Sequence, residues 1–453
     1  MKDIIAACVL ITICLTVNAF PIAKTPALAG GTIVYPSEAA DPAVKAQEDW
    51  QAISSALLSA GPGDVVKLGA GTFYLNKSVI IESFSGTLKG AGIGKTVVRT
   101  APGQIFDLTP NPVLTYVDGY ETKQSAMFLF LQPVDMVQRS VSVSGLSIIC
   151  DQPSNGWHRG YPSNPETGLN SVGGITVANS ELTVEEIINL DVDFRDIKVD
   201  GLEHSSFSSP NGTNFSCTFG VSTNGAANGV VSAKNLEVTN AVFGAGLFVW
   251  VGEGSHIQVS DSVFRNTFVG LYADGWHRLT VTGTKVIDNN RIGMSLWNSP
   301  VYLPAGFTNS EALVSDNSFK DGGVIDIYLD RGTNVSVLDN EFRGATAFTS
   351  ILAVRQSNSD FRNNRFVKTV GAPGPNLLVA VSQNVVLQDN NHKVSGKAGW
   401  TGDPLNGDCQ DGPGAILVDG SNNTYISGER FPANTSGDTM ICDLGTGTQY
   451  IPK

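Results

Sequence analysis

The motif Asp316-Asn317-Ser318-Phe319 recurs as Asp339-Asn340-Glu341-Phe342 and as Asn363-Asn364-Arg365-Phe366, at spacings of 23 and 24 residues. A short alternating apolar run precedes each copy and another follows it. Repeats of this length with strand patterns form solenoids, in which a repeat buries its apolar residues only by stacking on its neighbours. We therefore expect three short strands per repeat and one coil of a parallel β-helix per repeat.

The shared residues of the motif have predicted places in such a coil. The asparagines are expected where the second strand bends into the third, because asparagine tolerates left-handed backbone and its amide satisfies backbone groups of a turn. The phenylalanines two residues later are expected to stack inside the coils. The repeat thus predicts one internal ladder of amides and one of aromatic rings.

The beginning of the chain adds a second signature. A helix-like segment, Trp50 to Leu58, precedes Gly61 to Leu68, Gly71 to Tyr74 and Leu88 to Gly92. With the repeats, these segments resemble the right-handed parallel β-helix superfamily, which contains pectate-lyase-like polysaccharide lyases, hydrolases and epimerases. The resemblance covers roughly residues 30–430. It implies an all-β fold, a right-handed single-stranded parallel β-helix of about eleven coils, the first near Val65, with an N-terminal capping helix.

The resemblance specifies the fold but not the chemistry, because one scaffold can host many activities. The chain contains no Arg-x-Pro-x-x-Arg segment of pectate lyases, no Gly-His-Gly of polygalacturonases and no Asp-Pro-His segment of alginate epimerases. No catalytic residue of these families can therefore be transferred to a position here, and the candidate site must come from geometry.

Composition and targeting patterns predict an exported protein of one elongated domain. Residues 1–23 combine Lys2 with an apolar run, as in a secretory signal with cleavage near residue 19 or 29. We expect an N-terminal segment and capping helix over 24–63, the β-helix over 64–431 and a C-terminal cap over 432–453. The net charge of −13 and the pI of about 4.8 argue against nucleic acid or an anionic membrane as partner. A secreted, periplasmic or extracellular location follows, without membrane insertion; the oligomeric state stays open.

Four cysteines remain once the signal is removed: Cys150, Cys217, Cys409 and Cys442. Four cysteines in an exported protein allow three pairings. Cys150 with Cys217 and Cys409 with Cys442 are the local choices, and buried free thiols are the alternative, since cysteine is commonly a small core residue.

Alternation along the first strand of each coil predicts one row of outward residues. If Leu271, Ala273, Leu352 and Val354 point inward, the row consists of Trp250, Asp274, Trp297, Tyr328 and Arg355. With coils about 4.8 Å apart, this row would be roughly 19 Å long. Aromatic rings mixed with acids and an arginine suit a sugar chain, to which Tyr272 and Arg331 would add contacts, although aromatics are also common in strands for structural reasons.

Two reactions are compatible with such a row. In a uronate lyase, Arg355 would neutralise the sugar carboxylate and Tyr328 would be the base or the acid, with His277 as a rival. No cofactor is required, but Asp274 and Asp326 could instead hold Ca²⁺ through hard oxygen ligands. An inverting hydrolase needs two carboxylates about 6.5 to 9.5 Å apart, whereas Asp274 and Asp326 are expected roughly 11 to 12 Å apart.

The sequence therefore predicts an exported β-helix protein that binds and processes an extracellular polysaccharide, with lyase-type β-elimination favoured over hydrolysis. The alternative is a non-catalytic glycan-binding protein, adhesin or structural surface protein, for which aromatics and hydrogen-bond partners suffice.

Overall fold

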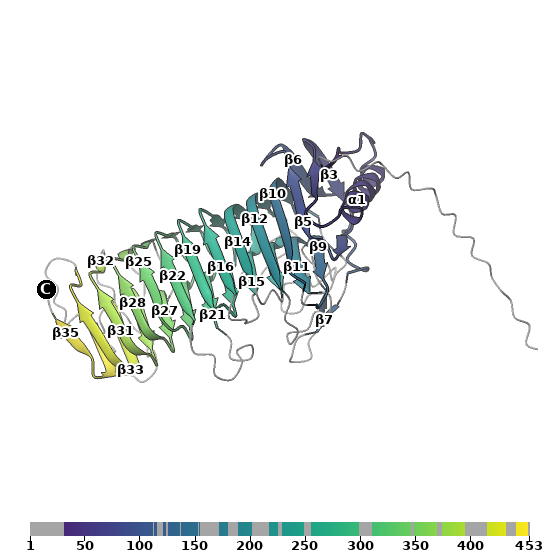
Figure 1. Cartoon of the computed structure of the whole chain (residues 1–453). Helices are drawn as coiled ribbons and strands as arrows, with labels where there is room; N and C mark the ends of the chain where they lie inside the picture. Colours follow the sequence, from purple (N-terminus) through teal and green to yellow (C-terminus); the bar gives the residue numbers. More distant parts are fainter. Residues whose placement is uncertain are drawn as a thin grey trace, which may run out of the picture.

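The computed structural model describes residues 31–111, 113–115, 121–123, 126–135, 137–152, 154, 172–179, 189–201, 217–224, 229–248, 255–298, 310–344, 346, 348–368, 374–394, 415–431 and 441–451. Nearly all of its regular structure is parallel strand. The strands of one 33-stranded sheet, from β1 to β35 without β7 and β8, stack along one axis, with helix α1 (Pro42–Leu58) at the N-terminal end (Figure 1). This arrangement is the predicted parallel β-helix with a capping helix.

Each coil contributes one strand to each of three faces. The first face runs through β4 (Val79–Glu82), β9 (Ala126–Gln132), β11 (Gly173–Asn179), β13 (Cys217–Asn224), β15 (Ala241–Phe248), β18 (Val269–Asp274), β21 (Ile292–Trp297), β24 (Ile325–Asp330), β27 (Thr349–Val354), β30 (Leu377–Ala380), the first half of β33 (Ile416–Ser427) and β34 (Ile441–Thr446).

The second face runs through β1 (Thr32–Val34), β2 (Val65–Leu68), β5 (Gly86–Gly90), the first halves of β10 (Arg139–Ile149), β12 (Leu190–Asp200) and β14 (Val230–Thr239), then β16 (His256–Ser260), β19 (Arg278–Thr282), β22 (Glu311–Ser315), β25 (Val335–Leu338), β28 (Ser357–Arg362), β31 (Gln383–Gln388), the second half of β33 and β35 (Gln449–Ile451). Val65 was expected in a first strand. This expectation is wrong, because β2 pairs with β1 and β5 on the second face.

The third face runs through β3 (Gly71–Leu75), β6 (Thr96–Thr100), the second halves of β10, β12 and β14, then β17 (Val263–Arg265), β20 (Lys285–Ile287), β23 (Ser318–Lys320), β26 (Glu341–Gly344), β29 (Arg365–Lys368) and β32 (Asn391–Val394). Outside the three faces, β7 (Val113–Thr115) and β8 (Glu121–Lys123) form an antiparallel pair.

The predicted amide ladder lies between the second and third faces. The side-chain amide of Asn340 donates to the Val314 carbonyl at 2.9 Å and to the Asn364 amide oxygen at 3.1 Å, and Asn364 repeats both contacts one coil on. The left-handed backbone belongs to the preceding residue, for example Asp339 at φ 56°, and not to the buried asparagine. The ladder thus ties each bend to the next coil.

The aromatic ladder lies one strand further on. The rings of Phe319, Phe342 and Phe366 stack with centroids 4.9 Å apart, which is the spacing of adjacent coils. His392 takes the next place at 5.0 Å from Phe366, and Phe431 follows at 5.4 Å. Both ladders that the repeat predicted are therefore confirmed.

Helix α1 covers the N-terminal coil. Asp41 caps the helix by accepting hydrogen bonds from the backbone N–H groups of Ala43 and Val44 at 2.8 and 3.2 Å. Ile53 and Leu57 are buried on the face that packs on the strands. The Trp50 indole donates to the Ser78 carbonyl at 2.9 Å. The helix thereby shields an edge that would otherwise expose unpaired strands.

Three of the four cysteines lie within the described residues: Cys442, which is disulfide-bonded, and Cys150 and Cys217, which are neighbouring thiols. The sulfurs of Cys150 and Cys217 are 3.1 Å apart, which exceeds the roughly 2.05 Å of a disulfide bond, so the predicted bond is absent here. The alternative of buried free thiols therefore holds for this pair. The contact with Cys217 and burial raise the pKa of the Cys150 thiol well above 9.0. Cys409 lies outside the described residues.

Among the described residues, no helix is long and apolar enough to cross a membrane. The predicted signal segment lies outside them.

Candidate functional site

Two columns of outward side chains run along the first face in its middle coils. The tyrosine column consists of Tyr272, Ser295 and Tyr328, which are register partners on β18, β21 and β24. The aspartate column consists of Asp274, Trp297 and Asp330, two residues further along the same strands. The pattern Tyr-x-Asp therefore occurs twice on this face, once in β18 and once in β24, and the coil of β21 lies between the two copies.

Within each Tyr-x-Asp unit the two side chains are hydrogen-bonded. The Tyr272 hydroxyl donates to Asp274 Oδ2 at 3.4 Å, and the Tyr328 hydroxyl donates to Asp330 Oδ2 at 3.3 Å. Both distances are at the long end for hydrogen bonds between oxygens. The tyrosines are half-buried, whereas Asp274 is 4% and Asp330 is 1% exposed. The columns therefore present carboxylates that are largely withdrawn from solvent beside partly accessible phenols.

Arg355 binds Asp330 in a forked ion pair. Its Nε donates to Asp330 Oδ1 at 2.8 Å and its second nitrogen contacts Oδ2. Arg355 follows β27 in a left-handed turn conformation, with φ 53°, which places its side chain over the preceding coil. The hydrogen bond to Asp330 raises the pKa of the guanidinium further. The pair gives the buried carboxylate of Asp330 a two-point, hydrogen-bonded partner, which is the geometry that arginine offers to carboxylates.

Tyr328 is a hydrogen-bond donor at neutral pH. Burial raises its pKa above 10.0, and the neighbouring Asp330 adds to the increase, while the charges of Arg355 and Arg331 oppose it. A phenol whose pKa exceeds that of free tyrosine gives up its proton less readily. This environment disfavours Tyr328 as a general base and leaves it a role as donor or acid.

Trp297 separates the two carboxylates of the aspartate column. Its side chain is half-buried, and its indole N–H has no hydrogen-bond partner among the described residues. Asp274 and Asp330 lie two coils apart in the same column, a separation of roughly 9.6 Å from two strand spacings. A partly exposed aromatic ring between two acids forms a platform on which a ring-shaped ligand could rest.

The predicted row of five residues is not one row. Trp250 lies outside the described residues. Asp274 and Trp297 are indeed neighbours, but the partner of Trp297 on β24 is Asp330, while Tyr328 pairs with Ser295 in the other column.

The alternation expected in β27 is also wrong. Ile351 and Ala353 are fully buried in the core, whereas Leu352 and Val354 point outward and continue the two columns. Arg355 follows this strand in the turn, and it still reaches the site through its contact with Asp330. Tyr328, Arg355 and Arg331 are thus brought together, since both arginine charges act on the Tyr328 hydroxyl.

Asp326 lies away from this cluster. It is buried on β24, opposite Gly293 of β21. A side chain added at Gly293 would come within 2.4 Å of the Asp326 carbonyl oxygen. Register places it roughly 16 Å from Asp274, from two coils and four residues. Asp274 and Asp326 therefore do not share a Ca²⁺ ion. Among the described residues, no group of three or more His, Cys, Asp or Glu side chains could hold a metal.

The remaining predicted residue, His277, lies in the turn between Asp274 and β19, half-buried, with its backbone N–H donating to Ser255 Oγ at 3.1 Å. The important residue that is absent from the predicted site is Asp330. The signal that could have found it is the repeated Tyr-x-Asp pattern, Tyr272-Ala273-Asp274 and Tyr328-Leu329-Asp330.

Comparison with known proteins identifies the architecture. The family model described as "Right handed beta helix region" matches residues 170–366 and 245–431. None of the curated proteins matches the sequence significantly. A mutant of DFA-IIIase from Arthrobacter chlorophenolicus A6 is similar in structure, with 14% identity, a TM-score of 0.52, and coverage of 93% of this chain and 99% of that one.

Two further structures are similar over most of their length. The A-module of mannuronan C-5 epimerase AlgE6 from Azotobacter vinelandii has 11% identity and a TM-score of 0.45, covering 89% of this chain and 95% of its own. PfbA, a surface adhesin of Streptococcus pneumoniae, has 13% identity and a TM-score of 0.43, covering 90% of each chain. At such identities the likenesses concern the fold.

Proposed function

The chain belongs to the right-handed β-helix family, and from that premise we propose that it is an exported protein whose first face binds and cleaves a polysaccharide. The observation that carries the proposal is the aspartate column, in which Trp297 lies between Asp274 and Asp330. The solved structures of similar fold include proteins named as an alginate epimerase and as a surface adhesin, which suits an extracellular or periplasmic place of action.

Binding would use the surfaces of the two columns together. A sugar ring has an apolar face that packs on an aromatic ring, and its hydroxyl groups both donate and accept hydrogen bonds. The partly exposed Trp297 ring can pack on such an apolar face, whereas its indole N–H is buried and lacks a partner in the described part of the chain. Tyr272 and Tyr328 flank the same platform on the adjacent coils. A few directed polar groups beside aromatic surface are typical of ligand sites.

Cleavage by hydrolysis fits the register better than β-elimination does. The separation of roughly 9.6 Å between the strand positions of Asp274 and Asp330 is close to the upper limit of the 6.5 to 9.5 Å range between the carboxyl groups of inverting glycosidases. Asp330, held in place by Arg355, would take a proton from water whose oxygen attacks the anomeric carbon. As the glycosidic C–O bond breaks, Asp274 would give its proton to the leaving oxygen.

Elimination remains the second candidate because Tyr328 and Arg355 are adjacent at one end of the site. They would supply a proton donor and a group that neutralises a uronate carboxylate. Two observations weaken this reading. The Arg355 guanidinium is already forked onto Asp330, and the raised pKa of Tyr328 opposes its use as a base.

The reaction can be identified from its products. The protein is incubated with a panel of neutral and uronate polysaccharides, and new reducing ends are measured together with the ultraviolet absorbance of unsaturated ends. Hydrolysis predicts reducing ends alone, with inverted configuration by proton NMR of the fresh product. Unsaturated ends would show that the reaction is elimination and not hydrolysis. The absence of new ends on every substrate would contradict the catalytic part of the proposal.

The binding part has its own test. Trp297→Ala should weaken affinity for the bound oligosaccharide at least tenfold in isothermal titration calorimetry, because the platform between the acids is lost. Tyr35→Ala is the matched control, since Tyr35 is an exposed aromatic residue beside the N-terminal coil. An unchanged dissociation constant for Trp297→Ala would remove the first face as the binding surface.

A further inference from the structure

The second face is hollowed along its outer surface, away from the two columns. One hollow of about 360 Å³ lies over β25, β28 and β31, and another of about 310 Å³ lies over β16, β19 and β22. Asn334 lines both, so the two hollows adjoin. We call the combined depression the amide groove. Six strands and five spacings give it a length of roughly 24 Å.

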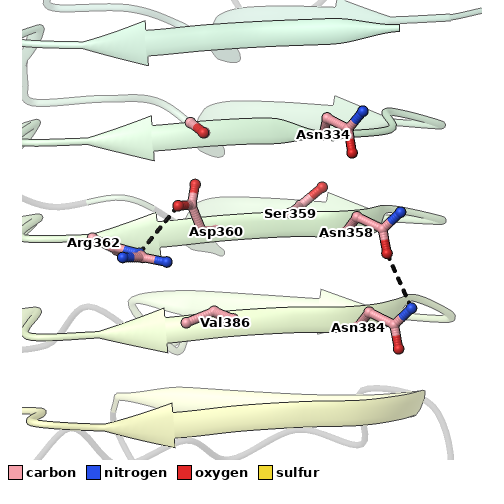
Figure 2. A pocket seen from close by; sticks show the side chains of 8 residues that line it. Asn334, Asn358, Ser359, Asp360, Arg362, Asn384 and Val386 are labelled. Atoms are coloured by element: carbon pink, nitrogen blue, oxygen red, sulfur yellow. Dashed lines mark hydrogen bonds and ion pairs between the residues drawn. The ribbon is translucent and has the colours of Figure 1, made fainter. Parts of the chain in front are cut away.

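Asparagines at the same turn of successive coils form one wall of the groove. Asn334, Asn358 and Asn384 have φ values of 57°, 49° and 53° and lie one beside the next at the starts of their strands (Figure 2). Asparagine is favoured at such left-handed positions. The Asn384 amide donates to Asn358 Oδ1 at 3.0 Å, and Asn423 donates to Asn384 Oδ1 at 3.3 Å. The fold thus presents one primary amide in each of these successive coils, and Glu311, Arg278 and His256 take the corresponding places in the other hollow.

The groove contains hydrogen-bonding capacity that the described residues leave unused. A primary amide has two N–H donors and two acceptor lone pairs, and each contact along the row uses only one donor and one acceptor. Asp360 reaches from the floor towards the neighbouring strand, and Arg362 lies beside it, 3.1 Å from Asp360 Oδ2 (Figure 2). Asp360 Oδ1 is buried and has no partner among the described residues. The exposed amides of Asn334, Asn358 and Asn384 are therefore the groups that can bond to the hydroxyl groups of a ligand.

The charges of the groove cancel in pairs. Arg362 faces Asp360, and Arg278 faces Glu311 at 3.7 Å. His256, near Thr280 and Gln258 in the second hollow, has a pKa below 6.5 because of burial and the charge of Arg278, so it is neutral at pH 7. Alternating donors and acceptors without excess charge match a neutral, polyhydroxylated chain. A polyanion would meet Asp360 and Glu311 without a surplus of cations.

We propose that the amide groove is a second carbohydrate-binding site, which holds an uncharged oligosaccharide or polysaccharide segment along the solenoid axis. Because the groove lies on the second face and the two columns lie on the first, we assign it a role in binding and not in the reaction. The site does not depend on the chemistry proposed for Asp274 and Asp330, and it would persist in a protein that cleaves nothing.

The test removes the amides without straining the turns. Asn358→Gly combined with Asn384→Gly keeps left-handed backbone accessible, because glycine adopts positive φ freely. Asn235→Gly is the matched control, since Asn235 is an exposed asparagine at φ 52° whose amide donates to Asp196 Oδ1 in a different turn. All variants are made in full-length protein that also carries Trp297→Ala, so that binding to the first face is already weakened.

Binding is measured by calorimetry with neutral gluco-, manno- and fructo-hexasaccharides and with a uronate hexasaccharide as the charged comparator. We expect residual affinity for one neutral probe in the Trp297→Ala background, a rise of at least tenfold in its Kd with the two glycines, and no change with Asn235→Gly. No binding in the Trp297→Ala background, binding of the uronate probe alone, or indifference to the two glycines would each overturn the site. If Trp297→Ala leaves wild-type affinity intact while the glycines remove it, the first-face proposal fails and the groove stands.

Discussion

The middle and late coils of the first face share one backbone and differ in what they display. In β18 and β24 the two outward columns carry Tyr272 and Asp274, then Tyr328 and Asp330. In β27 and β30 the same columns carry aliphatic residues, namely Leu352 and Leu378 in one and Val354 and Ala380 in the other, whereas β33 carries Leu417 in the first and Asp419 in the second. The inward positions are aliphatic throughout. The stacked interior therefore maintains the coil, and the outward columns are free to carry either chemistry or a second apolar cluster.

Asp330→Asn should reveal the largest difference between the middle and the late coils. If the middle coils are catalytic, the variant lowers turnover by about 10² to 10⁴, because the general base is lost. Val354→Ala alters the same column one coil later, where no chemistry is proposed, and should leave turnover within about twofold. Initial rates of reducing-end release on the preferred substrate measure both. Equal losses in the two variants would mean that the columns act only through the stability of the coil.

Asn364→Ala tests what the two regions have in common. Its amide donates to the Val337 carbonyl and to Asn390 Oδ1, and its oxygen accepts from the Asn340 backbone and side chain. Losing these four buried hydrogen bonds should reduce the free energy of unfolding by about 4 kcal/mol, at roughly 1 kcal/mol for each bond.

Asn363→Gly is the control for the ladder, since this neighbour is exposed and left-handed at φ 56° and glycine tolerates the conformation. Urea unfolding followed by circular dichroism should show a shift of less than about 0.5 kcal/mol for it. Comparable unfolding midpoints for Asn364→Ala and Asn363→Gly would show that the amide ladder does not stabilise the fold.

Arg355→Met and Arg362→Met compare the first and second faces. Both arginine side chains are 43% exposed, but the partner of Arg355, Asp330, is 1% exposed and the partner of Arg362, Asp360, is 26% exposed. Removing a partner from a buried carboxylate costs more than removing it from a solvated one. After allowance for the exposed guanidinium, we expect a loss of about 1 kcal/mol for Arg355→Met and under 0.5 kcal/mol for Arg362→Met in urea unfolding. The reverse order would show that Asp330 does not rely on Arg355.

The fold was largely predictable because its repeating unit can be recognised within the sequence itself. Asn317, Asn340 and Asn364 recur with a fixed offset to phenylalanine, and stacking allows only one arrangement of such a repeat. The orientation of β27 was not predictable from alternation, since Ile351 and Leu352 are both apolar although one is inside and the other outside. Where a strand is covered on both sides, hydrophobicity no longer distinguishes its faces.

The site depended on register, which the sequence specifies only indirectly. The interval between β21 and β24 includes residues 299–309, so counting along the chain does not give the partner of Trp297. Counting favoured Tyr328, whereas pairing assigns Asp330. Comparing the two Tyr-x-Asp units directly would have aligned them, because identical outward patterns on one face are expected to occupy identical columns.

The smallest effect concerns His256 in the amide groove. Burial, with the charge of Arg278, lowers its pKa below 6.5, so the folded state favours neutral imidazole. The unfolded chain therefore binds a proton first as pH falls. The stability that His256 contributes is complete above pH 6.5 and is lost as pH falls from that value through the folded pKa. Because His256 is only half-buried, the loss should stay under about 0.5 kcal/mol.

NMR titration of the imidazole Cε1–H signal of His256 measures this directly. Arg278→Gln should move the pKa part of the way back towards 6.5, since the burial that is the larger cause remains. Arg265→Gln is the control, because Arg265 is an exposed arginine of the third face, paired at 3.7 Å with Asp288. A pKa at or above 6.5 in the unaltered protein would place a charged imidazole in the groove at mildly acidic pH, and the match of the groove to a neutral chain would then hold only above that pH.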